Sequence, residues 1–240
     1  MKIFFISIST DMKAAKDCKT MENIERRYVG QFDTTEAADA GLLAVEERAD
    51  DSSREKRTYI VGSAATFNQN SVLLGDFIER IAPTAFDILK TGKDEAGKPI
   101  ETRGLFNHDP NFLLGRYPGT MNLSVDEKGL RYEILLPDSS YARDCAESIR
   151  RGDLRGSSFS FVVSSDGGEK WTYEGGQSIR TVLKVKSIVD CGPVTFPAYD
   201  SASCAIAKRS HTQFLAKRPA SQLSGRIASL KEFAGTREKK

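Results

Sequence analysis

The chain has 240 residues, of which 39% are hydrophobic and 28% are charged, a composition typical of a protein that buries one sizeable core. The formal net charge of +2 is too small to favour nucleic acid as the main ligand. The apolar stretch at residues 1–9 ends before Asp11 and Lys13 and is too short to cross a bilayer, so we expect no membrane association.

Cysteine spacing predicts free thiols and no metal centre. Cys18, Cys145, Cys191 and Cys204 form no CxxC pair, and no histidines are paired at the spacing of a metal site. We therefore expect a protein of a reducing compartment that uses no metal and no cofactor.

Residues 1–56 are rich in charge and predict a partly helical extension. Thr34 is a suitable N-cap, acidic residues follow it in the first turn, and an apolar group follows at residues 42–45. We expect a helix over residues 34–48, followed by a polar linker.

At Arg57 the composition changes, because β-branched and aromatic residues become frequent. Residues 57–67 predict a strand, and residues 121–136 predict a β-hairpin around a short turn that ends in Gly129. A helix capped by Ser139 or Ser140 then leads to the central stretch of the chain.

That stretch, residues 155–163, reads Arg-Gly-Ser-Ser-Phe-Ser-Phe-Val-Val and predicts a strand with two different faces. Successive side chains of a strand point to opposite faces, so Phe159 and Phe161 face the core together with Ser157. Ser158 opens the other face. If one hydroxyl of this strand is offered to a substrate, it is that of Ser158.

Further strands are predicted at residues 170–173 and 178–190, so residues 57–204 form a strand-dominated α+β domain. The simplest architecture is a barrel or a strongly curled sheet with a few helices packed around it. Residues 205–240 follow as a basic tail, with nine Lys or Arg against two acids and one late amphipathic helix over 223–234. Such a tail either contacts an anionic partner or is a solvated extension.

A serine hydroxyl becomes nucleophilic when a base removes its proton, and histidine is the usual base. Of the two histidines, His108 lies in the predicted core and His211 in the basic tail, so a Ser–His site on the core needs His108. We do not expect Asp109 to orient that imidazole, because adjacent side chains of an extended segment point apart.

The third group of such a site comes from elsewhere in the chain. Asp190 ends an apolar strand, where a buried carboxylate needs a partner, and Glu133 and Glu147 are alternatives. The oxyanion donors are expected to be backbone N–H groups near Gly156 or Gly192, where the missing side chain allows a peptide to approach closely. Arg151 and Arg155 add positive charge ahead of Ser158 or simply face solvent.

Four blocks of the sequence, in order, resemble the signature blocks of the tailed-phage prohead proteases, which are capsid-maturation serine proteases related in fold to the herpesvirus assemblins. The blocks are Gly104-Leu-Phe-Asn-His108-Asp-Pro, Gly129-Leu-Arg-Tyr-Glu-Ile-Leu-Leu-Pro-Asp, Ser148-Ile-Arg-Arg-Gly-Asp-Leu-Arg-Gly-Ser-Ser158-Phe-Ser-Phe and Val194-Thr-Phe-Pro-Ala-Tyr199. The resemblance implies that Ser158 is the nucleophile and His108 the base. The third member varies within the family, from histidine to carboxylate, and Asp190 is assigned to that role from its place just before the Val194 block. The resemblance also implies a largely closed antiparallel β-barrel ringed by helices. Ser160 departs from the family, which often has glycine there.

The resemblance further implies a serine endopeptidase that cuts scaffold segments or extensions of the major capsid protein, and itself, inside a procapsid assembling in the host cytoplasm. Self-association inside the procapsid and removal of the basic tail by self-cleavage are expected with it. Two alternatives remain: a non-catalytic assembly protein that keeps the barrel, and a nucleic-acid-binding barrel. The single tryptophan, Trp171, and the low net charge argue against the latter, except through the basic tail.

Overall fold

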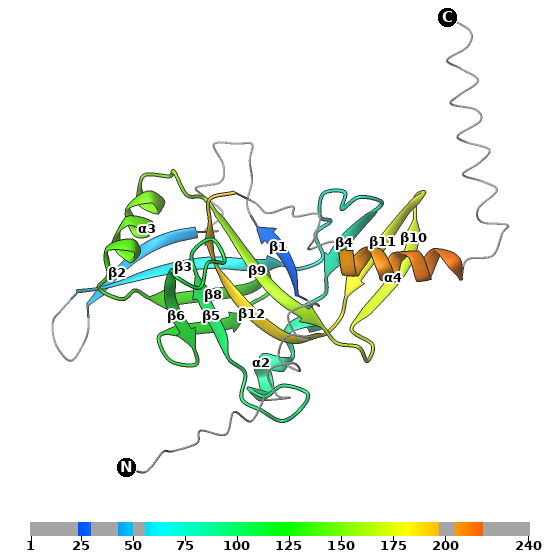
Figure 1. Ribbon diagram of the computed structural model, residues 1–240, viewed down its shortest axis with the longest axis horizontal. Coiled ribbons are helices and arrows are strands. Elements are labelled where there is room, and N and C mark those ends of the chain that lie inside the picture. The colour runs from blue at the N-terminus through cyan, green and yellow to red at the C-terminus, as the bar shows by residue number, and fades with distance from the viewer. Residues whose placement is uncertain (1–23, 30–42, 50–55, 197–204, 218–240) are drawn as a thin grey trace, which may run out of the picture.

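The computed structural model describes residues 24–29, 43–49, 56–196 and 205–217, and strands dominate it (Figure 1). These strands form three sheets. The five-stranded sheet has the order β1 (Glu25–Val29), β9 (Gly156–Val163), β12 (Val185–Val194), β5 (Thr102–Leu105) and β6 (Leu113–Tyr117). The four-stranded sheet has the order β2 (Leu43–Ala49), β3 (Lys56–Thr66), β8 (Gly129–Leu135) and β7 (Met121–Val125). The three-stranded sheet has the order β10 (Glu169–Glu174), β11 (Gln177–Val182) and β4 (Phe77–Ile81).

One hydrophobic cluster joins the two larger sheets. Ile60 and Ile134 of the four-stranded sheet belong to the same buried cluster as Phe159, Phe161 and Ile188 of the five-stranded sheet. Each sheet therefore buries an apolar face against the other, which is the main source of stability in a fold of this kind.

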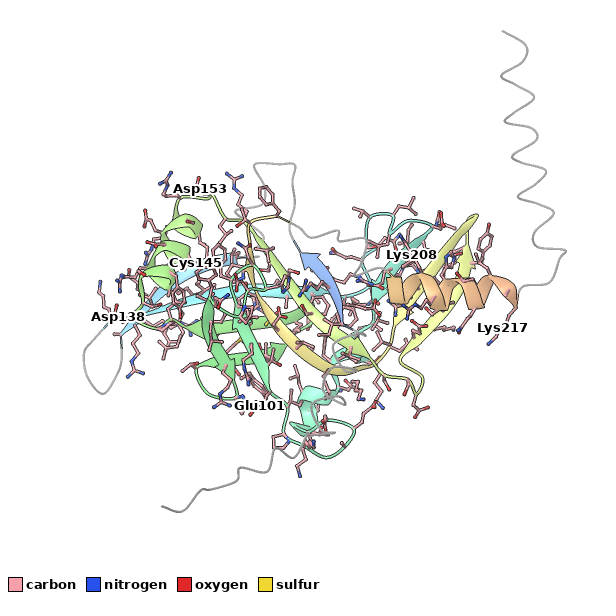
Figure 2. The ribbon with its side chains drawn as sticks, viewed as in Figure 1. Glu101, Asp138, Cys145, Asp153, Lys208 and Lys217 are labelled. Atoms are coloured by element: carbon pink, nitrogen blue, oxygen red, sulfur yellow. The ribbon has the colours of Figure 1, made fainter. Side chains whose placement is uncertain are left out.

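The helices lie around the sheets: η1 (Pro83–Phe86), α2 (Ile88–Thr91), α3 (Ser140–Arg150) and α4 (Ala205–Ala216). The predicted helix before residue 155 is α3, whose N-cap is Ser139 and whose buried residues recur at three- and four-residue spacing, Ala142, Cys145, Ala146 and Ile149. Figure 2 labels Cys145 on this helix, which packs beside β2. Gly152, at φ 75°, ends the turn after α3, and a left-handed residue there favours glycine.

The strand-dominated α+β prediction is confirmed, but the closed antiparallel barrel is not found among the described residues. β12 pairs with β5, and β11 with β4, in parallel orientation. β6 and β7 follow each other along the chain, yet they belong to different sheets. The sheets pack through their apolar faces instead of joining edge to edge into one ring. The likeness to the herpesvirus proteases stays a prediction.

The helix predicted over residues 34–48 is wrong where the structure describes it. Residues 43–49 form β2, which pairs antiparallel with β3 from Leu43↔Gly62 to Ala49↔Lys56, and residues 34–42 lie outside the described part. The helix signal was local, whereas pairing with a neighbouring strand decides the conformation of such a segment. Strands β1 and β2, both from residues 1–56, thus belong to the sheets.

The basic tail begins with a helix that the sequence pattern did not predict. On α4, Ala207 and His211 are buried, and His211 and Phe214 stack against Trp171 of β10. Figure 1 shows α4 beside β4, β10 and β11, and Figure 2 labels Lys208 and Lys217 toward its two ends. The late helix predicted over 223–234 lies outside the described residues. Across the described ranges, no helix is both long and apolar enough to cross a membrane.

Candidate active site

Strand β9 carries Ser158 and lies between β1 and β12 in the five-stranded sheet. Phe159 and Phe161 lie in the hydrophobic core, as the alternation predicts, and their rings stack at 4.8 Å between centroids. Ser157 also points inward, and its Oγ lies 2.7 Å from the buried hydroxyl of Tyr132. Burial raises the pKa of Tyr132, so this hydroxyl stays protonated. Ser158 lies on the opposite face of the strand.

His108 follows β5 in a tight turn with unusual backbone angles. Asn107 and His108 both have positive φ, at 56° and 58°. Consecutive left-handed residues other than glycine are costly, and such strain concentrates at functional sites. Asn107 holds the turn against the end of β12, because its N–H donates to the Pro193 carbonyl at 3.0 Å and its side chain exchanges hydrogen bonds with Thr195 at 2.7 and 3.1 Å.

Three adjacent strands bring Ser158, His108 and Asp190 together. The His108 Nε2 lies 2.7 Å from the Ser158 Oγ, although the two residues are 50 positions apart in the chain. On the other side of the ring, His108 Nδ1 is hydrogen-bonded to the Asp190 carboxylate. The sheet order β9-β12-β5 explains this convergence, since β12 lies between the strand of the serine and the strand that leads to the histidine. The His108 and Asp190 side chains are both 7% exposed.

The other acidic candidates have different partners. Glu133 forms an ion pair with Arg48 at 3.1 Å on the surface of the four-stranded sheet, and Glu147 is an exposed residue of α3. Asp109 accepts hydrogen bonds from Asn111 and so closes its own turn. His211 lies on α4 in the aromatic cluster around Trp171, away from this site.

The predicted positioning residues lie around the serine strand: Gly156 and Gly192 on paired strands, and Arg155 just before β9. Gly192 is the cross-strand partner of Ser158, and a Cβ there would lie 2.1 Å from the Leu105 carbonyl, so its glycine allows close strand packing. Gly156 begins β9 opposite Val194. The Arg155 guanidinium donates to the Gly152 carbonyl at 2.6 Å, at the end of α3. The oxyanion donors near Gly156 and Gly192 therefore stay a prediction.

Two contacts at the site come from residues that sequence reasoning did not select. The Ser160 hydroxyl lies 3.3 Å from His108 Nδ1 and accepts a hydrogen bond from Arg26 Nε at 3.2 Å. The Ser158 hydroxyl is within 2.8 Å of the Arg27 carbonyl, to which it can donate. Both arginines belong to β1, which pairs with β9. No local pattern in the sequence indicates this pairing, because it depends on two segments about 130 residues apart.

The buried cysteines are not competing nucleophiles. Cys145 and Cys191 are free thiols, and burial raises the pKa of Cys145 to about 12 and that of Cys191 still further above its usual value. The thiolate is the nucleophilic form of cysteine, so both protonated thiols are unreactive as nucleophiles at neutral pH. Within the described ranges, no three His, Cys, Asp or Glu side chains gather where they could hold a metal ion.

A serine, a histidine and a carboxylate linked by hydrogen bonds in this order are the arrangement found in serine hydrolases. Residues 44–217 match the family model described as caudovirus prohead serine protease, so the chain belongs to the prohead serine protease family, and the resemblance noted in the sequence is confirmed. Among solved structures, the chain is similar to the bacteriophage T4 capsid assembly protease gp21, at 12% identity and a TM-score of 0.42, over 73% of this chain and 98% of that one. A comparison with curated proteins gave no match.

Proposed function

We propose that this protein is a serine endopeptidase that cuts scaffold segments or extensions of the major capsid protein, and itself, inside the procapsid. The observation that supports it best is the hydrogen-bonded series Ser158–His108–Asp190 in a member of the prohead serine protease family.

The proposed mechanism follows from the direction of these hydrogen bonds. Asp190 accepts the Nδ1–H of His108 and leaves Nε2 free to take the proton of Ser158. The Ser158 oxygen then attacks the peptide carbonyl and forms a bond to its carbon, and the resulting imidazolium returns the proton to the leaving amine. In the second half of the reaction His108 takes a proton from water, whose oxygen attacks the acyl carbon. The bond between that carbon and the Ser158 oxygen then breaks, and His108 returns the proton to Ser158. Backbone N–H groups near Gly156 or Gly192 are proposed to hold the oxyanion.

We take residues 57–204 to be the protease domain, and the segment that follows this domain has a proposed role as well. We take the basic tail over residues 205–240 to be removed by self-cleavage, and self-association to occur inside the procapsid in the host cytoplasm. On this view α4 has to leave its contacts with Trp171 before the tail is lost.

Co-expression with the phage capsid protein, followed by intact-mass measurement, tests the proposal. We expect shortened capsid and scaffold subunits with the native protein, and full-length subunits with Ser158→Ala or His108→Ala. Ser124→Ala is a matched control, because Ser124 is an exposed residue of β7, and it should process subunits normally. Heads that assemble without any shortened subunit would instead support a non-catalytic assembly protein.

A further inference from the structure

The loop between β5 and β6 carries His108 and is closed on itself. The Phe106 N–H donates to the Phe112 carbonyl at 3.2 Å, and the Phe112 N–H donates to the Asp109 carbonyl at 3.0 Å. The Asp109 N–H donates back to the Phe106 carbonyl at 3.1 Å. These hydrogen bonds give the loop its shape, but they do not determine where it lies relative to the neighbouring strands. The position of His108 beside Ser158 therefore depends on contacts that leave the loop.

Asn107 makes three such contacts with the end of β12. Its N–H donates to the Pro193 carbonyl at 3.0 Å, and its side-chain oxygen accepts from the Thr195 N–H at 2.7 Å. Its side-chain nitrogen donates to Thr195 Oγ1 at 3.1 Å. A side-chain amide offers one acceptor and one donor group, so it pairs with both the N–H and the hydroxyl of a single threonine.

β12 is also the strand that places both partners of His108. Asp190 belongs to β12, and Gly192 of the same strand is the cross-strand partner of Ser158. A shift of the loop along β12 would change both distances of the imidazole, from Nε2 to the serine and from Nδ1 to the carboxylate. The contacts of Asn107 thus hold the histidine in register with the two residues it acts with.

The backbone of the turn explains why it needs such contacts. Asn107 and His108 have φ of 56° and 58°. This left-handed region is unfavourable for residues with a Cβ, although asparagine tolerates it better than most. Two such residues in succession persist only where the surrounding structure holds them. Without its partner on β12, we expect the turn to relax toward ordinary backbone angles and to move the imidazole away from Ser158.

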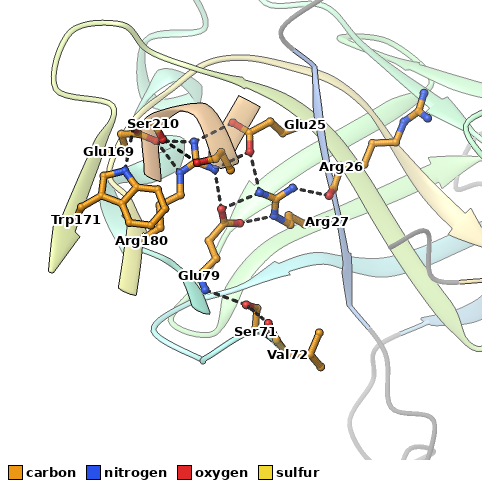
Figure 3. Close-up of polar contacts among 11 residues, drawn as sticks. Glu25, Arg26, Arg27, Ser71, Val72, Glu79, Glu169, Trp171, Arg180 and Ser210 are labelled. Atoms are coloured by element: carbon orange, nitrogen blue, oxygen red, sulfur yellow. Dashed lines mark hydrogen bonds and ion pairs between the residues drawn. The ribbon is translucent and has the colours of Figure 1, made fainter. Parts of the chain in front are cut away.

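The ion-pair cluster beside β9 has a different role (Figure 3). Arg27 of β1 donates to Glu79 of β4 through Nη2 at 2.7 Å, and Arg180 of β11 donates to the same carboxylate at 2.8 Å. These charged side chains are buried and converge on one another in Figure 3. The cluster joins three strands and contributes to stability, so a change in it shows what a loss of stability alone does to the histidine.

We propose that Asn107 is a positioning residue for the reaction. Through its paired hydrogen bonds to Thr195, it holds the left-handed turn at the end of β12. The turn sets the His108 imidazole between the Ser158 hydroxyl and the Asp190 carboxylate. This inference rests on the proposed function, because it takes the serine as the nucleophile and the histidine as the base. Asn107 acts on the rate of the chemical step and not on substrate binding.

Proton NMR of the His108 ring tests this placement without requiring catalysis. The proteins are full-length chains carrying Ser158→Ala. The signal is the downfield resonance of the Nδ1–H that donates to Asp190, identified by its loss when His108→Ala is added. We expect Asn107→Gly to broaden or remove this resonance, because glycine keeps the backbone angles but loses both side-chain hydrogen bonds to Thr195. Asn107→Asp keeps the acceptor for the Thr195 N–H and should retain the resonance.

Two control variants separate positioning from stability and from the general effect of glycine. Asn68→Gly is matched, because Asn68 also has a positive φ, 55°, and is exposed in the loop before β4. Glu79→Gln disturbs the buried cluster and lowers stability. Both controls should keep the resonance. Its persistence in Asn107→Gly, its loss in either control, or its absence from the Ser158→Ala parent would overturn the proposal.

Single-turnover cleavage of capsid protein by chains with the native Ser158 measures the effect on rate. We expect Asn107→Gly to lower kcat by about 10- to 100-fold, since a small displacement of a catalytic group has effects of this size. KM should stay nearly unchanged, because the residue is assigned no contact with substrate. Asn107→Asp should recover most of the native rate, and Asn68→Gly should match it. A loss confined to KM would contradict the positioning role.

Thr195 provides a second variant for the case in which Asn107→Gly does not fold. Thr195→Val removes the Oγ1 acceptor and keeps the backbone N–H, so it should weaken the resonance and lower kcat by about threefold or more. Thr195→Ser retains the hydroxyl and should behave as the native chain. A native resonance and rate in Thr195→Val would refute the inference. Because the NMR comparison needs no cleavage, a native chain that cuts no capsid protein would refute the proposed function separately.

Discussion

Replacing Asp190 by asparagine isolates the part of the site that the sequence specified least. The two side chains have nearly the same shape, so the substitution changes which group donates the hydrogen bond and little else. A carboxylate accepts from His108 Nδ1–H, whereas the asparagine amide can donate to Nδ1 and so favour the tautomer that carries its proton on Nε2. That proton points at the Ser158 Oγ, 2.7 Å away, and the imidazole can no longer act as a base.

The size of the effect follows from this change of tautomer. In Ser–His–Asp proteases, the same substitution lowers kcat by about 10⁴-fold while the geometry is retained, which corresponds to about 5.4 kcal/mol of transition-state stabilisation. Ser160 cannot replace the carboxylate, because its Oγ is 3.3 Å from Nδ1 and it carries no charge. We therefore expect Asp190→Asn to lose nearly all activity and Ser160→Ala to lose much less.

Single-turnover cleavage of purified capsid protein, followed by intact mass, measures these rates, and thermal unfolding checks that each variant is folded. Asp109→Asn is the matched control, because Asp109 is adjacent to His108 in sequence but bonds to Asn111; its rate should stay near that of the native protein. A rate for Asp190→Asn within tenfold of the native rate would refute the tautomer argument. A larger loss with Ser160→Ala than with Asp190→Asn would assign the orienting role to Ser160.

Three further predictions concern stability and thiol chemistry. Glu79→Gln removes one charge of the buried ion pair between Arg27 and Glu79. This change should destabilise the fold by about 3–5 kcal/mol, which lowers Tm by about 6–20 °C. Glu133→Gln, at the exposed pair with Arg48, should cost no more than about 1 kcal/mol, and equal Tm shifts for the two variants would contradict the burial argument. The pKa of Glu79 in the folded protein lies below its ordinary value of 4.5. The ionised carboxylate therefore contributes its full stabilisation above pH 4.5, and this contribution is lost as the pH falls through the folded-state pKa. The native protein and Glu79→Gln should thus converge in stability in acid. Tyr132→Phe leaves the buried Ser157 hydroxyl without its partner and should cost about 1–3 kcal/mol in denaturant unfolding, and an unchanged midpoint would show that this hydrogen bond is not needed. Iodoacetamide with peptide mapping should leave Cys145 and Cys191 unmodified in the folded protein and alkylate both in denaturant, and rapid native labelling would contradict their burial.

Local patterns predicted the elements whose partners lie close in the chain. The α3 helix follows from an apolar spacing that any exposed helix beside a core needs, and the β7–β8 hairpin from a turn in which the Asp126 carboxylate accepts from the N–H groups of Lys128 and Gly129. The two faces of β9 follow from strand alternation alone. The same reasoning failed at β2, because a segment with helix signals became a strand once β3 was available as its partner.

By itself, the sequence determined the family, through its four ordered blocks, and the strand-dominated α+β class, through its strand patterns. It also determined Ser158 and His108 as candidates, since the predicted core has one histidine and one strand with two such different faces. Only the tertiary structure decided that Asp190, and not Glu133 or Glu147, faces the imidazole, and that β1 covers the serine. Both decisions depend on which strands become neighbours in a sheet. That neighbourhood is set by the burial of apolar faces across the whole domain, a property that no short stretch of sequence contains.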